Sequence, residues 1–232
     1  MAHKILAIGA HPDDVEFGCA PILIKETAKG NQVKILVLSK GEAASSGTAK
    51  ERVQESVDAA KFMSAEIEFL DFGGDCHIEY NTQNSFKIAR EIRNFKPNVI
   101  LAPQPDENQH PDHSAAGKIV RDAARFARYG GLKEIKDLPA HKIDQLYFYF
   151  VTQAFNQDPD IIIDASDVYE LWVKAMACHK TQMKGKEYLN LISSRAAALG
   201  TAIGTKYAVG LWANDPIRLD TISEITLSSR NY

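Results

Sequence analysis

The chain has 232 residues, of which 45% are hydrophobic and 25% are charged, as in an ordinary globular protein. Its 27 basic and 30 acidic side chains leave a net charge of −3, which argues against non-specific binding to nucleic acid or to an anionic membrane surface. No apolar run approaches the ~18 residues of a membrane span, and the N-terminal segment is too short for a secretory signal. With three separated cysteines, we expect a cytoplasmic protein without disulfide bonds.

Apolar stretches alternate with helical patterns along the chain. The expected strands are Lys4–Ala10, Val33–Ser39, Ile67–Phe72, Val99–Pro103, Gln145–Val151, Asp160–Ala165 and a short one near Ile222–Leu227. The expected helices are Glu16–Lys29, one opened by a Thr48–Glu51 capping box, Thr82–Phe95, His113–Arg128, one from a cap at Asp167 to about His179, and Tyr188–Leu199.

Four successive strand–helix units predict one α/β domain over residues 1–232, with a Rossmann-like, doubly wound and mostly parallel sheet. In the common strand order 3-2-1-4-5, the first and fourth strands are neighbours. Ligands bind beyond the carboxyl ends of these two strands, where the strand order reverses. We therefore expect the active site at this switch point.

Two clusters of imidazole and carboxylate side chains follow the first and the fourth predicted strand. They are the segments His11–Asp14 (HPDD) and His110–His113 (HPDH). Because the two strands are expected side by side, both clusters should meet at one pocket. Three nitrogen or oxygen ligands with an open position for water are the composition of a catalytic zinc site.

Other interpretations of these segments remain open. Each His-Pro-Asp turn could merely cap the helix that follows it. The acidic pair after the first strand could hold Mg²⁺ in a phosphohydrolase or phosphotransfer domain, although imidazole ligands favour zinc. A catalytically inactive binding module of the same fold is a further alternative. A dinucleotide site is disfavoured, because the first turn lacks GxGxxG and carries carboxylates where a pyrophosphate would lie.

With these motifs, the sequence resembles the PIG-L/LmbE family of zinc-dependent N-deacetylases. The resemblance extends through Lys40-Gly41-Glu42, the segment Gly47–Arg52 and the late stretch Ser194–Tyr207. It implies removal of the acetyl group from an N-acetylglucosamine unit, in a conjugate or in a chitin-type oligosaccharide. The chain length and the GTAxxR segment are similar to the bacillithiol-pathway branch, which acts on N-acetylglucosaminyl-malate.

The resemblance also implies roles for individual residues. His11, Asp14 and His113 match the ligands of one zinc ion per chain. Asp13 matches the general base, and His110 matches the imidazole that stabilises the oxyanion or protonates the leaving group. Asp112 matches a carboxylate that orients and charges a histidine, and Arg52 matches a substrate-contacting arginine. Tyr188 falls where some members hold a tyrosine over the oxyanion. Further substrate-binding candidates are Gly41, Glu42 and Gln109.

Two departures from the family pattern are visible. Cys19-Ala20-Pro21 stands where a Gly-Gly pair is common, and we expect this change to alter helix packing only. Gln109 stands where arginine is common, which removes a possible anion contact and argues against a carboxylate on the substrate. The resemblance further implies a homo-oligomer, often a hexamer. Asp75 and His77, after the third strand, are further candidates for lining the cleft.

Overall fold

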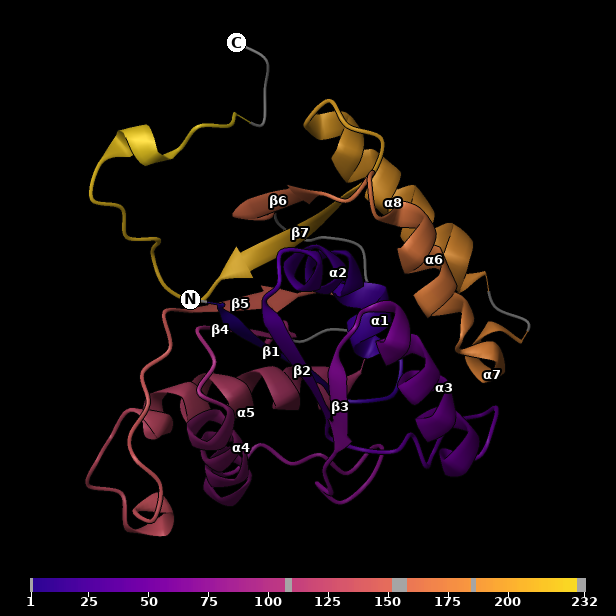
Figure 1. Ribbon diagram of the computed structural model, residues 1–232. Coiled ribbons are helices and arrows are strands. Elements are labelled where there is room, and N and C mark those ends of the chain that lie inside the picture. The colour runs from indigo at the N-terminus through magenta and orange to yellow at the C-terminus, as the bar shows by residue number, and fades with distance from the viewer. Residues whose placement is uncertain (1, 107–109, 152–157, 185–186, 229–232) are drawn as a thin grey trace.

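A seven-stranded sheet with helices on both faces forms the protein (Figure 1). The computed structural model describes residues 2–106, 110–151, 158–184 and 187–228. The strands are β1 (Lys4–Gly9), β2 (Gln32–Val37), β3 (Glu66–Phe69), β4 (Val99–Pro103), β5 (Gln145–Tyr149), β6 (Ile161–Asp164) and β7 (Ala208–Ala213). The α-helices are α1 (Asp14–Gly18), α2 (Ala20–Ala28), α3 (Ala49–Phe62), α4 (Thr82–Phe95), α5 (Pro111–Ala127), α6 (Tyr169–Ala177), α7 (Lys180–Met183) and α8 (Tyr188–Ala202), and two short 3-10 helices are η1 (Lys133–Ile135) and η2 (Ile222–Glu224).

The strand order is β3-β2-β1-β4-β5-β7-β6. The first five of these strands are parallel, with Ile5 of β1 opposite Val33 of β2 and Val99 of β4. The expected doubly wound α/β fold is therefore confirmed, and β1 and β4 are neighbours as predicted. None of the helices in the described ranges combines the length and apolar character needed to cross a bilayer.

Strand β1 separates two hydrophobic cores, which explains why its apolar run is nearly continuous. Ile5 and Ala7 belong to the core beneath α1, α2 and α6, whereas Leu6 and Ile8 belong to the core beneath α4 and α5. These four side chains are at most 4% exposed. A parallel strand covered on both faces has no solvent side, so it shows no polar alternation.

The first predicted helix is divided into α1 and α2 at Cys19, whose φ of −146° is not helical. Pro21 lies in the first turn of α2. Within a continuous helix, this proline would lack a backbone donor and clash with the carbonyl of Phe17. The prediction of one continuous helix over Glu16–Lys29 is therefore wrong, because the segment Cys19-Ala20-Pro21 ends one helix and begins another.

The C-terminal part also differs from the prediction. The segment near Ile222–Leu227 contains the 3-10 helix η2 rather than a strand. The strand in this region is β7, which lies earlier in the chain and pairs antiparallel with both β5 and β6. Five of its six residues are buried, so its sequence AVGLWA lacks the polar alternation that marks an antiparallel strand.

Candidate active site

The loops after β1 and β4 meet and bring three donor atoms together. His113 Nε2 lies 3.3 Å from His11 Nδ1 and 3.0 Å from Asp14 Oδ1, and His11 Nδ1 lies 3.8 Å from Asp14 Oδ2. Donors at about 2.0–2.2 Å from a tetrahedral zinc ion lie ~3.3 Å apart. These three buried side chains therefore fit a single zinc ion, and two imidazole nitrogens suit zinc better than Mg²⁺.

The backbone holds the Asp14 carboxylate in position. Its Oδ2 accepts hydrogen bonds from the backbone N–H groups of Ala10 (2.8 Å) and His11 (3.0 Å). Burial opposes the charged form of Asp14, but the neighbouring His113 and His11 hold its pKa well below the usual value. Asp14 is thus ready to act as an anionic ligand.

The other nitrogen of His11 faces two carboxylates. His11 Nε2 lies 3.0 Å from Asp112 Oδ2 and 3.1 Å from Asp75 Oδ1. A carboxylate on the remote N–H of a histidine fixes the tautomer that offers its other nitrogen to a metal. In the metal-free protein these carboxylates, together with Asp14, overcome the effect of burial and raise the pKa of His11 well above its usual value. The cluster therefore attracts positive charge.

Asp13 lies beside this donor set, in an unusual backbone conformation. It is the N-cap of α1 with φ of 107°, in the left-handed region that costs a non-glycine residue free energy. Its Oδ2 lies 3.3 Å from Arg52 Nη2. Burial raises the pKa of Asp13 to about 6, while Arg52 acts in the opposite direction. The strained turn directs Asp13 and Asp14 to different partners.

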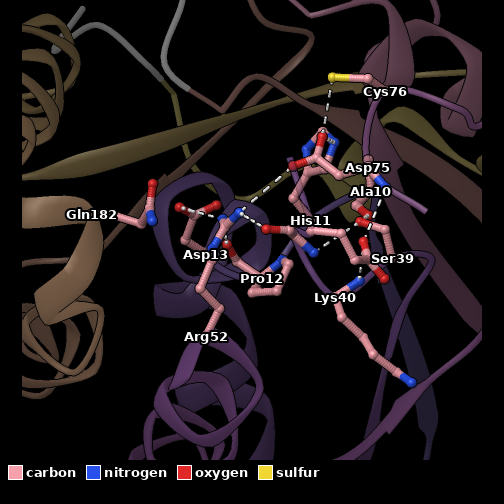
Figure 2. Close-up of polar contacts among 12 residues, drawn as sticks. Ala10, His11, Pro12, Asp13, Ser39, Lys40, Arg52, Asp75, Cys76 and Gln182 are labelled. Carbon is pink, nitrogen blue, oxygen red and sulfur yellow. Dashed lines mark hydrogen bonds and ion pairs between the residues drawn. The ribbon is translucent and has the colours of Figure 1, made fainter. Parts of the chain in front are cut away.

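Arg52 is 4% exposed and its guanidinium joins three loops (Figure 2). Nη2 donates to the Pro12 carbonyl at 2.7 Å and Nη1 donates to the Gly41 carbonyl at 3.3 Å. Nη1 also lies 3.8 Å from Asp75 Oδ2. Gly41 has φ of +71°, and a Cβ built there would lie 2.0 Å from Nη1, so a side chain at this position would be strained and would displace the Arg52 guanidinium.

Glu42 connects the loops that follow β2 and β3. Its Oε2 accepts from Lys40 N at 3.1 Å and from Asp75 N at 3.0 Å. Glu42, which is exposed, and Gly41, which is buried, do not line the pocket. Their observed contacts position Asp75 and Arg52.

His110 caps α5, because its Nδ1 accepts from Asp112 N at 3.3 Å. The Asp112 carboxylate contacts His11 Nε2 and raises the pKa of that ring, so the histidine that Asp112 orients is His11. Burial, followed by the charges of His11 and His113, lowers the pKa of His110. In the neutral ring the proton is then on Nε2, which makes that nitrogen a hydrogen-bond donor.

A pocket of about 290 Å³ opens over these groups. Among the residues predicted for the site, those that line it are His11, Asp13, Asp14, Arg52, Asp75, His110, His113 and Tyr188. Asp112 lies behind His11, and Gln109 lies outside the described residues. His77 is directed to the backbone carbonyl of Asp75 (2.8 Å) and does not line the pocket.

Cys76 and Gln182 also line the pocket, and sequence reasoning missed both as site residues. Cys76 directly follows Asp75, in the loop after β3. Its position after a strand of the parallel sheet is therefore a sequence signal that could have indicated a pocket residue. Gln182 lies on α7. Its Nε2 donates a hydrogen bond to the Ser46 carbonyl (3.1 Å), which holds the side chain beside the pocket. Because 136 residues separate these partners, no local pattern indicates their contact.

Residues 6–124 match the family model of PIG-L, described as GlcNAc-PI de-N-acetylase. A diacetylchitobiose deacetylase of Thermococcus kodakarensis is 30% identical over 227 residues, which cover 90% of this chain and 82% of that protein. A 4-oxalmesaconate hydratase of Pseudomonas putida is 24% identical over 223 residues, which cover 89% of this chain and 82% of that protein.

A solved structure shares most of the fold. The structure of a conserved protein from Thermus thermophilus has a TM-score of 0.84 and 26% identity, and the match covers 93% of this chain and 96% of that chain. The match of residues 6–124 spans β1 to α5, and it therefore includes both the HPDD and the HPDH segments. On this match and on the 30% identity to the Thermococcus protein, the chain belongs to the PIG-L family.

Proposed function

We propose that the protein is a zinc-dependent N-deacetylase that removes the acetyl group from an N-acetylglucosamine unit of a small substrate. The observation that carries this proposal is the convergence of His11, Asp14 and His113 on one point, with Asp13 beside them and outside the donor set. This combination supplies a metal site and a separate carboxylate base within one pocket.

A zinc ion held by these three residues would polarise the acetyl carbonyl and lower the pKa of water. Asp13 removes the proton from the attacking water and then delivers it to the departing amine. Neutral His110 donates its Nε2–H to the developing oxyanion, as the tautomer set by Asp112 N allows. Tyr188 lines the same pocket and is a second candidate donor.

The pocket supports a small, polar substrate. Its volume of about 290 Å³ is at the lower end of the range for ligand sites, which suits one sugar unit with the remainder of the substrate outside. Polar side chains that include Ser45 and Gln182 line it and can bind sugar hydroxyls. The name of the Thermococcus relative supports an N-acetylated amino sugar as the substrate class.

The test is a screen for amine release by the zinc-loaded protein. The substrates are N-acetylglucosamine, its malate and inositol conjugates, and N,N'-diacetylchitobiose. We expect a free amine and acetate in equal amounts from at least one of them. The matched control is the Asp13→Asn protein loaded with the same metal.

Two results would contradict the proposal. One is hydrolysis of a phosphate ester with Mg²⁺ and no amine from any N-acetyl substrate, which would favour the phosphohydrolase alternative. The other is hydration of an unsaturated dicarboxylate without amine release, which would assign the chain the activity in the name of the Pseudomonas relative.

A further inference from the structure

A thiol lies at the pocket, next to two of its polar side chains. Cys76 is exposed and follows β3 in a left-handed conformation with φ of 66°. Its Sγ lies 3.5 Å from Asp75 Oδ1 and 3.8 Å from His110 Nε2, and the latter two atoms are 3.9 Å apart. The mechanism proposed above does not use this thiol.

These three distances are close to those around a metal ion. A tetrahedral zinc ion with Zn–S of about 2.3 Å and Zn–N or Zn–O of about 2.0–2.2 Å separates its ligands by ~3.3–3.6 Å. The sulfur–oxygen edge of the observed triangle is within this range, the sulfur–nitrogen edge is about 0.2 Å wider, and the nitrogen–oxygen edge is about 0.6 Å wider than the ~3.3 Å of two such ligands. Small side-chain rotations would therefore bring sulfur, nitrogen and oxygen onto one ion.

The charge balance around Asp75 also favours a cation. His11 Nε2 has one hydrogen to donate, yet Asp112 Oδ2 and Asp75 Oδ1 both lie within 3.1 Å of it. Once Asp112 accepts that hydrogen, the other neighbours of Asp75 Oδ1 are the Cys76 thiol, a weak donor at 3.5 Å, and His110 Nε2 at 3.9 Å. Arg52 contacts the other oxygen of Asp75 and only at 3.8 Å.

His11 itself is a poor third ligand for this position. His11, Asp75 and His110 form a second group of possible ligands, but Nδ1 of His11 already belongs to the first group with Asp14 and His113. A neutral imidazole offers one lone pair to a metal. The Cys76 thiolate completes the set without sharing a ring between two ions.

We propose that Asp75, Cys76 and His110 form a second metal site, selective for a thiolate-binding divalent cation such as Zn²⁺, and that its occupation inhibits the enzyme. The cation replaces the thiol proton of Cys76, so one proton is released per ion bound. Thiolate and imidazole ligands select zinc over Mg²⁺ and Ca²⁺.

The inhibition follows from the tautomer of His110 and rests on the proposed function. Nε2 binds a cation only when the ring proton is on Nδ1, so the 3.3 Å contact from Asp112 N would be lost. His110 would then have no hydrogen on the nitrogen that faces the substrate. The bound cation would also occupy part of the pocket.

The test uses the spectrum of cobalt. Protein loaded with one equivalent of zinc is titrated with Co²⁺, and the near-ultraviolet thiolate-to-cobalt charge-transfer band is recorded. The first site offers only imidazole and carboxylate donors, so cobalt that exchanges into it gives no such band. We expect the band to grow to one equivalent and one proton to be released.

Cys76→Ser should remove the band and weaken binding of the second ion. Loss of a hydrogen-bond partner of a metal ligand lowers metal affinity by ~10–100-fold, and loss of a ligand itself should cost at least as much. Cys76→Gly is a second variant that suits the left-handed backbone. Cys178→Ser is the matched control, because Cys178 is partly exposed and does not line the pocket. Excess Zn²⁺ should inhibit amine release by the wild type and the control, and inhibit Cys76→Ser at least ~10-fold more weakly.

The absence of a thiolate band, or its persistence in both Cys76 variants, would overturn the second site whatever the enzyme's substrate. A thiolate band without inhibition by excess Zn²⁺ would overturn the inhibitory role. Failure of every N-acetyl substrate would contradict the proposed function and leave the spectroscopic test of the second site intact.

Discussion

At the scale of single residues, Asp13 and Asp14 are chain neighbours with different surroundings. Asp14 is held by two backbone N–H groups and faces His113, whereas Asp13 faces Arg52. The left-handed conformation of Asp13 produces this divergence. The proposed ligand Asp14 and the proposed base Asp13 can therefore be separated by mutation.

His113→Ala should lose most of the bound zinc, because only two of the three converging donors remain. Elemental analysis of purified wild-type and mutant protein, with close to one zinc per wild-type chain, is the measurement. His141→Ala is a control, since Nε2 of that ring donates to the Pro97 carbonyl at 2.7 Å and His141 does not line the pocket. A mutant that retains a full equivalent would remove His113 from the ligand set.

Asp13→Asn should retain the metal and lower kcat by at least ~10²-fold, the usual contribution of a general base. Zinc content and steady-state kinetics on the same preparation give both quantities. Near-normal turnover by a zinc-loaded mutant would exclude Asp13 from the reaction.

Arg52→Lys tests whether Arg52 positions Asp13 or binds the substrate. The guanidinium already contacts Asp13 and two backbone carbonyls, and an ammonium cannot reproduce this fork. We expect kcat to fall by up to ~10²-fold for neutral and malate-linked N-acetylglucosaminides alike, because a base displaced by about 1 Å loses that much. A rise in KM confined to the malate conjugate would instead assign Arg52 to carboxylate binding.

At the scale of elements, the start of α3 determines where Arg52 lies. Thr48 Oγ1 accepts from Glu51 N at 3.2 Å and Glu51 Oε2 accepts from Thr48 N at 2.8 Å, so the predicted capping box is confirmed. Arg52 follows this box by one residue and lies in the first turns of the helix.

Thr48→Ala should lower the free energy of unfolding by about 1 kcal/mol, the usual effect of losing a cap. Urea denaturation of the metal-loaded protein measures this change, and Thr48→Ser, which retains the hydroxyl, is the matched control. An unchanged midpoint for Thr48→Ala would show that tertiary contacts alone hold this end of α3.

At the scale of the whole molecule, the C-terminal segment after β7 extends away from the sheet (Figure 1). Ile222, Ile225 and Leu227 in this segment are 90%, 65% and 88% exposed. Three large apolar side chains close together in one exposed segment are typical of a contact surface.

We therefore expect a homo-oligomer in which this segment contacts another copy of the chain. Light scattering should give a mass above that of one chain, and the triple change Ile222→Ser, Ile225→Ser and Leu227→Ser should reduce it. A single-chain mass for the wild type at micromolar concentration would reject the oligomer.

Local sequence patterns were sufficient to predict the strands and helices of the parallel half of the fold. Runs such as Lys4–Gly9 and caps such as Thr48–Glu51 depend on neighbouring residues only, so periodicity and capping rules predict them. The HPDD and HPDH segments could be assigned to one pocket because β1 and β4 are adjacent in the common strand order. Strand β7 could not be predicted in this way, because its burial depends on pairing with β5 and β6.

The sequence by itself determined the α/β class, because local apolar and helical periods mark its strands and helices. The order of the parallel strands followed from the common doubly wound arrangement, and the candidate zinc ligands from the resemblance to the PIG-L family. Only the tertiary structure decided that Asp112 serves His11, that Arg52 is enclosed by three loops, and that Cys76 lies beside His110. Each of these contacts joins segments that are distant in the chain. Their geometry depends on how the loops pack at the edge of the sheet, which no local pattern encodes.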